Sequence, residues 1–457
     1  MICASDAGNS RFGATGRAVL LALALGAAPA ASAVTLQEAY TLAFQNDSKF
    51  RSVRAETRAS GTAIDQARAG FMPNIRLDID RTETRNSVIR NENAFVGVGA
   101  RTYQTDNGTI TITQPVFRRE AIARLVQAKA VVKQADFTLL AAEQDLMLRT
   151  TAAYLTVLAA TDSVTLAAAE REAVGKVLDL ARERLKSGLG TITNQYDAEA
   201  RFAVTRAREV EAQNKLRDAR QGLREITGRL IVDVQSLRGE FALQTPDPAN
   251  IDQWVDTALG QNLALQARRE AVEVARQEVE RQRAGHFPSV NLLVNLNRRD
   301  AGSSLVNGSF GPGTLVETSD VTLRVTVPIF EGGLTSAVTA EAAFRFQKVQ
   351  EDLEMERRSV ERSTRAAYDG TLSAVSLVQA LKQSVTAQES ALELKEQGFK
   401  AGLFALLQVL DAQRDLYLAR RDHAQSRYDY LLFRLRLKLA AGMLAESDIV
   451  GTGAALQ

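Results

Sequence analysis

The chain has 457 residues, of which 45% are hydrophobic but only 6% aromatic, and its formal net charge is +2. A charge so near neutrality, without a basic stripe, argues against a nucleic-acid-binding protein. Ala, Leu and Arg are the most frequent residues, and with so few aromatic residues this composition is typical of long helices in coiled contact rather than of compact domains with thick aromatic cores.

The N-terminus has the features of an export signal. Two arginines precede an apolar run over residues 18–28, and Ala31-Ser32-Ala33 supplies an A-x-A cleavage pattern. A membrane-spanning helix needs about 20 apolar residues, more than this run contains. We therefore predict a signal peptide at residues 1–33, which would remove Cys3, the only cysteine. The mature chain, beginning at Val34, would have no disulfide, no thiol chemistry and no cysteine for lipid attachment.

The mature chain contains two copies of one unit. Four pairs of short segments recur, and their spacings agree within two residues of one another. The pairs are RAGFMP at 68–73 with RAGHFP at 283–288, TQPVF at 113–117 with TVPIF at 326–330, KSGL at 186–189 with KAGL at 400–403, and DA at 197–198 with DA at 411–412. A tandem duplication explains them. We predict a first repeat at residues 34–245, a second at 246–445 and a C-terminal tail at 446–457.

Prolines mark the places where helix is expected to give way to strand. The four junction residues, two in each repeat, are Pro73, Pro115, Pro288 and Pro328. Proline breaks helix interiors, and the segments 118–185 and 334–400 contain none. Each of these segments is long enough for a helix that would reach roughly 100 Å.

The segments after the Lys-x-Gly-Leu turns predict coiled helix packing, because small or apolar residues recur there at alternating steps of three and four. The seam of the first copy is Gln195, Ala198, Phe202, Thr205, Glu209, Ala212, Leu216, Ala219, Leu223 and Ile226. The seam of the second copy is Val409, Ala412, Leu416, Ala419, His423, Ser426, Tyr430, Phe433, Leu437 and Ala440. We therefore interpret His423 as a packed interior residue rather than as a ligand.

Between the junction prolines the period of the apolar residues changes from helical to two. In the first such run Ile75, Leu77 and Ile79 alternate with polar residues. Strands are predicted at about 74–84, 107–117, 289–298 and 319–329, and each is close to the nine to eleven residues that a tilted strand needs to cross a bilayer. A half-buried soluble hairpin would explain one such strand. Four of them in an exported protein favour a membrane barrel.

Four strands cannot enclose a water-filled barrel, and open strand edges are not tolerated in lipid because their backbone groups would lack partners. Other copies must therefore complete the barrel. Two chains would give eight strands with an interior filled by side chains, whereas three would give twelve with room for a lumen. We predict a mixed fold, in which a membrane β-barrel with four strands per chain joins a long α-helical barrel and a trimer completes the twelve strands.

These features together resemble the TolC-like outer-membrane exit ducts of Gram-negative bacteria over essentially the whole mature chain. The resemblance rests on the duplicated RAGxxP, the Pro-[Val/Ile]-Phe junctions with Glu331-Gly332-Gly333 after the second, the Lys-x-Gly-Leu turns, and VLDAQ at 409–413 followed by YDYL at 428–431. It implies a homotrimer in the lipid of the outer membrane, with helices that reach through the periplasm. It also implies two partners, a periplasmic adaptor (membrane fusion) protein and an inner-membrane pump.

The resemblance places the Lys-x-Gly-Leu turns at the periplasmic tip, which in the family docks the adaptor and forms the closed entrance. The docking residues would be Gly188, Leu189, Gly402 and Leu403, and the gate residues would be Asn194, Phe399, Phe404, Gln408 and Asp411. Well-known members carry acidic and basic residues at the gate, whereas here only Asp411 keeps a carboxylate. We therefore expect closure to depend more on hydrogen bonds and Phe404 packing than on salt bridges. The alternative for Phe404, Leu189 and Leu403 is that they only pack within the helix turns.

Four phenylalanines lie within two residues of the junction prolines, namely Phe71, Phe117, Phe287 and Phe330. Aromatic side chains favour membrane interfaces. We therefore predict that these four form an aromatic girdle at the periplasmic face of the barrel.

The sequence does not indicate an enzyme, because it contains no HExxH, GxSxG or phosphate-binding Gly-Lys-Thr/Ser motif. No cofactor, metal or nucleic acid is expected. A periplasmic coiled-coil scaffold would explain the helices but not the strands, and a diffusion porin would explain the strands but not helices of this length. Within the duct interpretation, type I protein secretion with an ABC transporter and an adaptor is preferred, and the channel of a multidrug efflux pump is the alternative. The missing lipidation cysteine favours secretion, because many dedicated drug-efflux ducts are lipoproteins.

Overall fold

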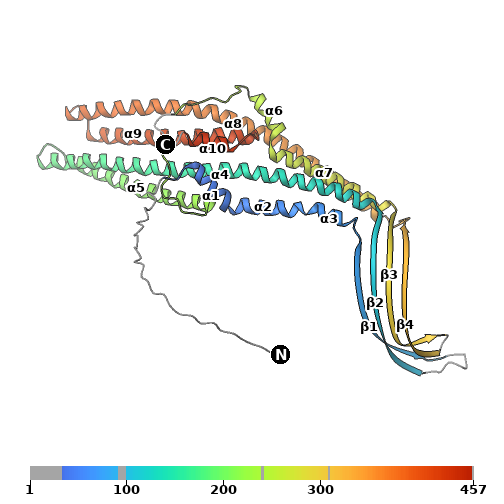
Figure 1. The fold of residues 1–457 in the computed structure, drawn as a ribbon. Helices are drawn as coiled ribbons and strands as arrows, with labels where there is room; N and C mark the ends of the chain where they lie inside the picture. Colours follow the sequence, from blue (N-terminus) through green and yellow to red (C-terminus); the bar gives the residue numbers. More distant parts are fainter. Residues whose placement is uncertain (1–32, 91–98, 238–240, 307–308, 455–457) are drawn as a thin grey trace, which may run out of the picture.

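A computed structural model describes residues 33–90, 99–237, 241–306 and 309–454. All but the last residue of the expected signal peptide, 1–33, lie outside the described residues. The long helices form an elongated body, and a four-stranded sheet stands at one end of it, turned away from the direction of the helices (Figure 1). The described elements occur in two copies of the same order, with short helices first, then two strands, then two long helices.

The first copy contains α1 (Leu36–Asn46), α2 (Ser48–Gly61), α3 (Ala63–Ala69), β1 (Asn74–Val88), β2 (Gly99–Arg118), α4 (Arg119–Lys186) and α5 (Ile192–Thr227). The second copy contains α6 (Ile251–Gln261), α7 (Leu263–Arg283), the 3₁₀ turn η1 (Ala284–His286), β3 (Ser289–Val306), β4 (Ser309–Thr326), α8 (Leu334–Lys400) and α9 (Leu406–Ala440). A last helix, α10 (Glu446–Gly453), lies in the segment expected to be a tail. Its Ile449 is buried, and its Asp448 pairs with Lys438 of α9.

The two long proline-free helices that the sequence predicts are present as α4 and α8, with bounds within a residue of the prediction. α4 has 68 residues and α8 has 67, so each is roughly 100 Å long. α5 packs along α4, α9 packs along α8, and α4 also contacts α7 and α9. The helical body is therefore built from two long hairpins that meet side by side.

The predicted seams of α5 and α9 are confirmed, because none of their twenty positions is exposed. Ala198 and Thr205 of α5 and Val409 and Leu416 of α9 are buried. His423 is half-buried, and burial together with nearby cationic side chains lowers its pKa. It therefore stays in the neutral form that a packed interior histidine requires.

The main core lies where the two copies meet, and two buried tyrosines fasten the chain around it. Tyr154 of α4 donates a hydrogen bond to the Val34 carbonyl at 2.8 Å and accepts one from the Gln235 amide at 2.8 Å. Tyr430 of α9 accepts a hydrogen bond from the Gln244 amide at 2.8 Å. The segments before α1 and after α5 are therefore held against the long helices by hydrogen bonds that satisfy both buried hydroxyls.

Asp47 joins the short helices of the first copy to α4. It caps α2 by accepting a hydrogen bond from the Phe50 amide at 2.6 Å, and its carboxylate accepts two more from Arg149 at 3.0 and 3.1 Å. Burial alone would raise the pKa of Asp47, but these hydrogen bonds and the Arg149 charge together hold the pKa below its usual range. The folded chain therefore favours the ionised carboxylate at this position.

The four strands form one antiparallel sheet in the order β1-β2-β3-β4. They extend further toward the hairpin loops than the sequence predicts, because the apolar alternation that marks a strand fades there. At its other end β4 stops at Thr326 instead of 329, ahead of Pro328, which has no amide hydrogen to donate to a ladder. Pro115 lies inside β2 rather than at its end, and the pairing with β3 shifts between Pro115 and Phe117.

The register gathers the apolar residues of all four strands on one face, since directly opposed residues point to the same side. One row across the sheet consists of Ile75, Ile112, Val294 and Val321. The neighbouring row on the other face consists of Arg76, Thr111, Asn295 and Asp320. An apolar face backed by a polar one is the pattern of a barrel wall that separates lipid from a water-filled lumen.

Candidate functional site at the helical tips

The hairpin of α4 and α5 turns at Gly188. This glycine has a φ of 71°, and its amide donates to the Leu185 carbonyl at 3.1 Å. The Leu189 amide donates to the Arg184 carbonyl at 2.9 Å. These two bonds make up a Schellman motif, in which a helix ends at a residue of positive φ that favours glycine.

The hairpin of α8 and α9 turns in the same way at Gly402, whose φ is 77°. Its amide donates to the Phe399 carbonyl at 3.1 Å, and the Leu403 amide donates to the Gly398 carbonyl at 2.8 Å. The duplication is thus preserved at the level of single hydrogen bonds. The helices that follow differ, because Thr191 caps α5 with its side chain whereas α9 has no side-chain cap.

Each turn exposes an apolar side chain at the end of the helical body. Leu189 is 80% exposed and Leu403 is 77% exposed. Ile192 and Leu407, in the first turns of α5 and α9, are about half exposed. Clustered apolar side chains at a surface commonly mark a site for binding another protein, so both tips are candidate docking sites.

A small core directly behind the tips joins the two hairpins. Leu178 of α4, Ala198 of α5 and Leu410 of α9 are buried in it, and Phe399 of α8 packs against it. The Arg184 guanidinium lies over the Phe399 ring, 4.6 Å from its centroid, which adds a cation–π contact. All four long helices thus contribute to one packed cluster, and Phe399 is one of its members.

Phe404 packs back onto its own turn. Its ring occupies the space that a β-carbon on Gly398 would need, yet the side chain remains 41% exposed. The packing role that the sequence offers for Phe404 is therefore present.

Asp411 has two cationic partners that the sequence does not predict. Its carboxylate accepts a hydrogen bond from Arg201 of α5 at 2.7 Å, and Arg414 lies 3.5 Å away. Arg201 is one helical turn beyond Asp197, the counterpart of Asp411 in the first copy. The duplication aligns α5 with α9, but no pattern within either helix pairs Arg201 with Asp411. An ion pair inside the chain therefore contributes at this tip, in addition to the expected packing.

The other two expected gate residues lie in separate turns. Asn194 is half-buried at the start of α5, where its amide donates to the Thr191 hydroxyl at 3.3 Å. Gln408 is exposed in the first turn of α9. The structure thus brings Phe404 and Gln408 into one turn and places Asn194 in the other.

At the opposite end of the body, the four expected girdle residues lie where helix changes to strand. The exposed fraction is 39% for Phe71, 42% for Phe117, 44% for Phe287 and 86% for Phe330. Arg119 lies over the Phe287 ring at 4.5 Å, and the Gln114 side chain donates to the Phe71 carbonyl at 2.9 Å. These rings are therefore at the surface of the junction.

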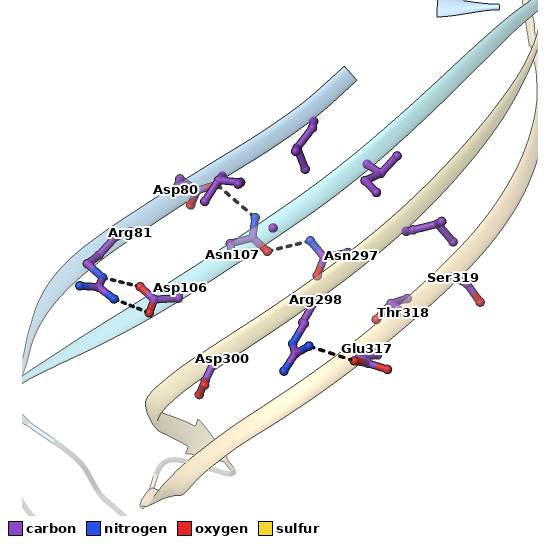
Figure 2. A pocket seen from close by; sticks show the side chains of 15 residues that line it. Asp80, Arg81, Asp106, Asn107, Asn297, Arg298, Asp300, Glu317, Thr318 and Ser319 are labelled. Atoms are coloured by element: carbon purple, nitrogen blue, oxygen red, sulfur yellow. Dashed lines mark hydrogen bonds and ion pairs between the residues drawn. The ribbon is translucent and has the colours of Figure 1, made fainter. Parts of the chain in front are cut away.

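A hollow of about 1000 Å³ on the sheet is lined by four apolar side chains, Leu77, Ile79, Ile110 and Leu296, and by charged and polar side chains (Figure 2). Arg81 of β1 donates two hydrogen bonds to Asp106 of β2, at 2.6 and 2.7 Å. Asn107 connects three strands, because it donates to Asp80 at 3.2 Å and accepts from Asn297 at 2.7 Å. These contacts tie neighbouring strands together. Within the described ranges no group of three or more His, Cys, Asp or Glu is arranged to hold a metal ion.

Known proteins share both the sequence pattern and the fold. The family model for outer membrane efflux proteins matches residues 39–229 and 254–443. Outer membrane protein TolC of Vibrio cholerae is 32% identical over 425 residues, which cover 93% of this chain and 94% of that protein. Proteases secretion protein PrtF of Dickeya chrysanthemi is 30% identical over 447 residues, which cover 96% and 95%. The CmeC outer membrane channel of Campylobacter jejuni has the same fold, with a TM-score of 0.78 at 14% identity over 92% of this chain and 90% of that one.

Proposed function

The chain belongs to the outer membrane efflux protein family, and from this premise we propose that it is the outer-membrane duct of a type I protein secretion system. It is a channel protein of the outer membrane rather than an enzyme, and its helices extend into the periplasm. Channels of this family are trimers that act with an adaptor and an inner-membrane transporter. The inner-membrane partner proposed for this chain is an ABC transporter.

The similarity to PrtF is the observation that favours protein as the cargo. The name of that relative assigns it to the secretion of proteases, and the similarity extends over 96% of this chain. Multidrug efflux is the alternative, since the family as a whole is described by efflux. A periplasmic scaffold is no longer an explanation, because the sheet has one apolar face across all four strands.

The two tip turns would dock the periplasmic adaptor. Leu189 and Leu403 are mostly exposed, stand on matching Schellman turns and lie at the end of the body remote from the sheet. Burying an exposed leucine in an interface stabilises a complex by about 1.5–3 kcal/mol. In a trimer the six turns would offer six such contacts, which together can hold an adaptor ring without any charged pair.

The experiment removes the gene and restores it as the wild type or as the Leu189→Asp/Leu403→Asp variant. Two outputs are measured in parallel, namely the amount of protein released into the medium and the sensitivity of the cells to small toxic molecules. Protein secretion predicts loss of released protein with the tip variant while the trimer remains in the outer membrane. Loss of resistance with unchanged protein release would assign the duct to multidrug efflux instead.

A matched control separates docking from general damage by a new charge. Val450 of α10 is exposed and is remote in the sequence from both turns, so Val450→Asp should leave secretion intact. Normal secretion together with unchanged resistance in the tip variant would mean that the adaptor docks elsewhere. A tip variant that no longer forms trimers is replaced by Leu189→Ala/Leu403→Ala, which removes the apolar contact without adding charge and should weaken secretion.

A further inference from the structure

The described sheet ends at two open edges, β1 on one side and β4 on the other. In lipid the unpaired amides and carbonyls of an edge strand have no water to bond. Each edge must therefore pair with the complementary edge of another copy. The sequence duplication makes it possible to say which residues meet there.

The two hairpins have the same register once the copies are aligned at their prolines. In the first hairpin Asn74 lies opposite Thr113. Their counterparts in the second copy are Ser289 and Thr326, and these two residues also lie opposite each other. Equivalent strands therefore pair at equivalent residues, without a slip.

The boundary between the two hairpins inside the chain then serves as a template for the boundary between chains. There, β2 pairs with β3, and Thr111 lies opposite Asn295. The counterpart of Thr111 on β4 is Arg324, and the counterpart of Asn295 on β1 is Asp80. We propose that Arg324 lies opposite Asp80 of the partner subunit and forms an ion pair with it on the lumen face. This proposal rests on the proposed function in one respect only, because it requires a closed barrel made of several copies.

The faces of the two edge strands fit this register. It places Val325 opposite Ile79 of the partner subunit and Val327 opposite Leu77 of the partner subunit. All four side chains are apolar, and Val325 belongs to the apolar face that faces lipid. A slip by one residue would turn polar side chains toward lipid along the whole edge. The apolar side chains therefore determine which face of each edge strand turns toward lipid, independently of the charges.

The charges at the edges are also available for pairing. Arg324 is exposed, and no hydrogen bond or ion pair of its side chain occurs in the part of the chain that the structure describes. Asp80 is exposed as well and accepts one hydrogen bond, from Asn107 at 3.2 Å. At the internal boundary the equivalent pair is neutral. At this position of the boundary the pair is thus charged only between separate chains, and directly opposed opposite charges stabilise paired strands.

Disulfide trapping tests the register, because Cys3 is the only cysteine in the chain. Opposed residues of antiparallel strands have Cα atoms about 4.5–5.5 Å apart, within the range that a disulfide can bridge. The Asp80→Cys/Arg324→Cys variant should give a covalently closed trimer on a non-reducing gel of outer-membrane fractions. Asp80→Cys/Asp320→Cys is the off-register control, because it moves one partner by about 13 Å along the same face of β4. A yield at least tenfold above the control is expected, and an equal or lower yield would overturn the register.

Charge exchange tests the ion pair in chains without cysteine at the boundary. Asp80→Arg and Arg324→Asp should each lower the temperature at which the trimer dissociates in detergent, and the double exchange should restore most of that loss. A double variant no more stable than the single variants would contradict the pair. Neither measurement depends on cargo. Correct crosslinks in a duct that secretes no protein would therefore reject type I secretion and leave the pairing intact.

Discussion

The ring of Phe404 lies against the backbone of Gly398, on the far side of the α8–α9 turn. A β-carbon at position 398 would overlap the ring, so the glycine and the aromatic side chain are matched to each other. The Schellman motif at Gly402 brings the chain back onto α8 and thereby sets this contact. Turn geometry thus determines where the Phe404 ring is held.

Removing that ring should open the entrance. Phe404→Ala is expected to raise the closed-state conductance of the purified trimer, because the 41% of the side chain that is exposed would no longer fill space near the axis. Gly398→Ala should have a smaller effect in the same direction, since it displaces the ring without deleting it. Single-channel recording measures both. An unchanged Phe404→Ala channel that opens only when salt is raised would show that the gate is ionic.

The ion pair between Arg201 and Asp411 should tune ion selectivity. Asp411→Asn removes a carboxylate and should reduce the preference for cations and the block by divalent cations. Arg201→Gln leaves the carboxylate without its 2.7 Å partner and should increase both, because three carboxylates near one axis attract cations. Reversal potentials in a salt gradient distinguish the two variants. Shifts in the same direction would mean that Asp411 does not face the conduction path.

The positive φ of Gly402 should make this position intolerant of any side chain. Gly402→Ala is expected to cost about 1–2 kcal/mol of stability, because a β-carbon strains a left-handed backbone. Gly222 of α5 is the matched control, since a β-carbon there meets open space and the residue lies within a regular helix. Gly222→Ala should stabilise by about 0.5–1 kcal/mol. Thermal unfolding followed by helical circular dichroism measures both changes, and equal effects would contradict the assignment.

Acid should weaken the Asp47 junction. Because the folded chain holds the pKa of Asp47 below its usual range, its contribution to stability is present at neutral pH. That contribution is lost as the pH falls through the lowered pKa. Asp47→Asn should cost about 1–3 kcal/mol at pH 7, where it removes hydrogen bonds to a charged partner. The difference from the wild type should shrink as the pH drops below the usual carboxyl range. Unfolding measured at several pH values tests this, and a constant difference would refute it.

The long helices could be predicted from the sequence because two simple signals agree. Proline is absent from 118–185 and 334–400, and the duplication repeats both segments. The ends of the strands were harder to predict, because alternation is a signal only where one face is buried or meets lipid. Beyond Glu83 of β1 and before Gln104 of β2 both faces are largely polar, yet the ladder continues to the pair Val88 and Gly99. Backbone hydrogen bonds, rather than a side-chain pattern, hold these outer ends of the two strands together.

At the tip, too, some features could be predicted from the sequence and others could not. The turns and their glycines were predictable, since Lys-x-Gly-Leu ends a helix in both copies. The partner of Asp411 was not predicted, because Arg201 lies in another helix and no local pattern identifies it. Likewise, the contact of Phe404 with Gly398 depends on how the turn folds back. The contact of Arg201 with Asp411 depends on how α5 packs on α9. The periodicity of each helix identifies its buried face but not the residues that this face contacts.

The continuous course of α4 also has a mechanical consequence. The main core holds this helix up to about Ala159, and the remainder projects to Lys186 as an arm roughly 40 Å long. Tilting that arm by about 10° at its base would carry the tip sideways by about 7 Å. Three such arms moving together would change the aperture by far more than any side-chain rotation. Asp162 lies at the base of this arm, and its carboxylate accepts a hydrogen bond from Tyr428 of α9 at 2.6 Å. We therefore expect this contact to influence the opening although it is remote from the tip.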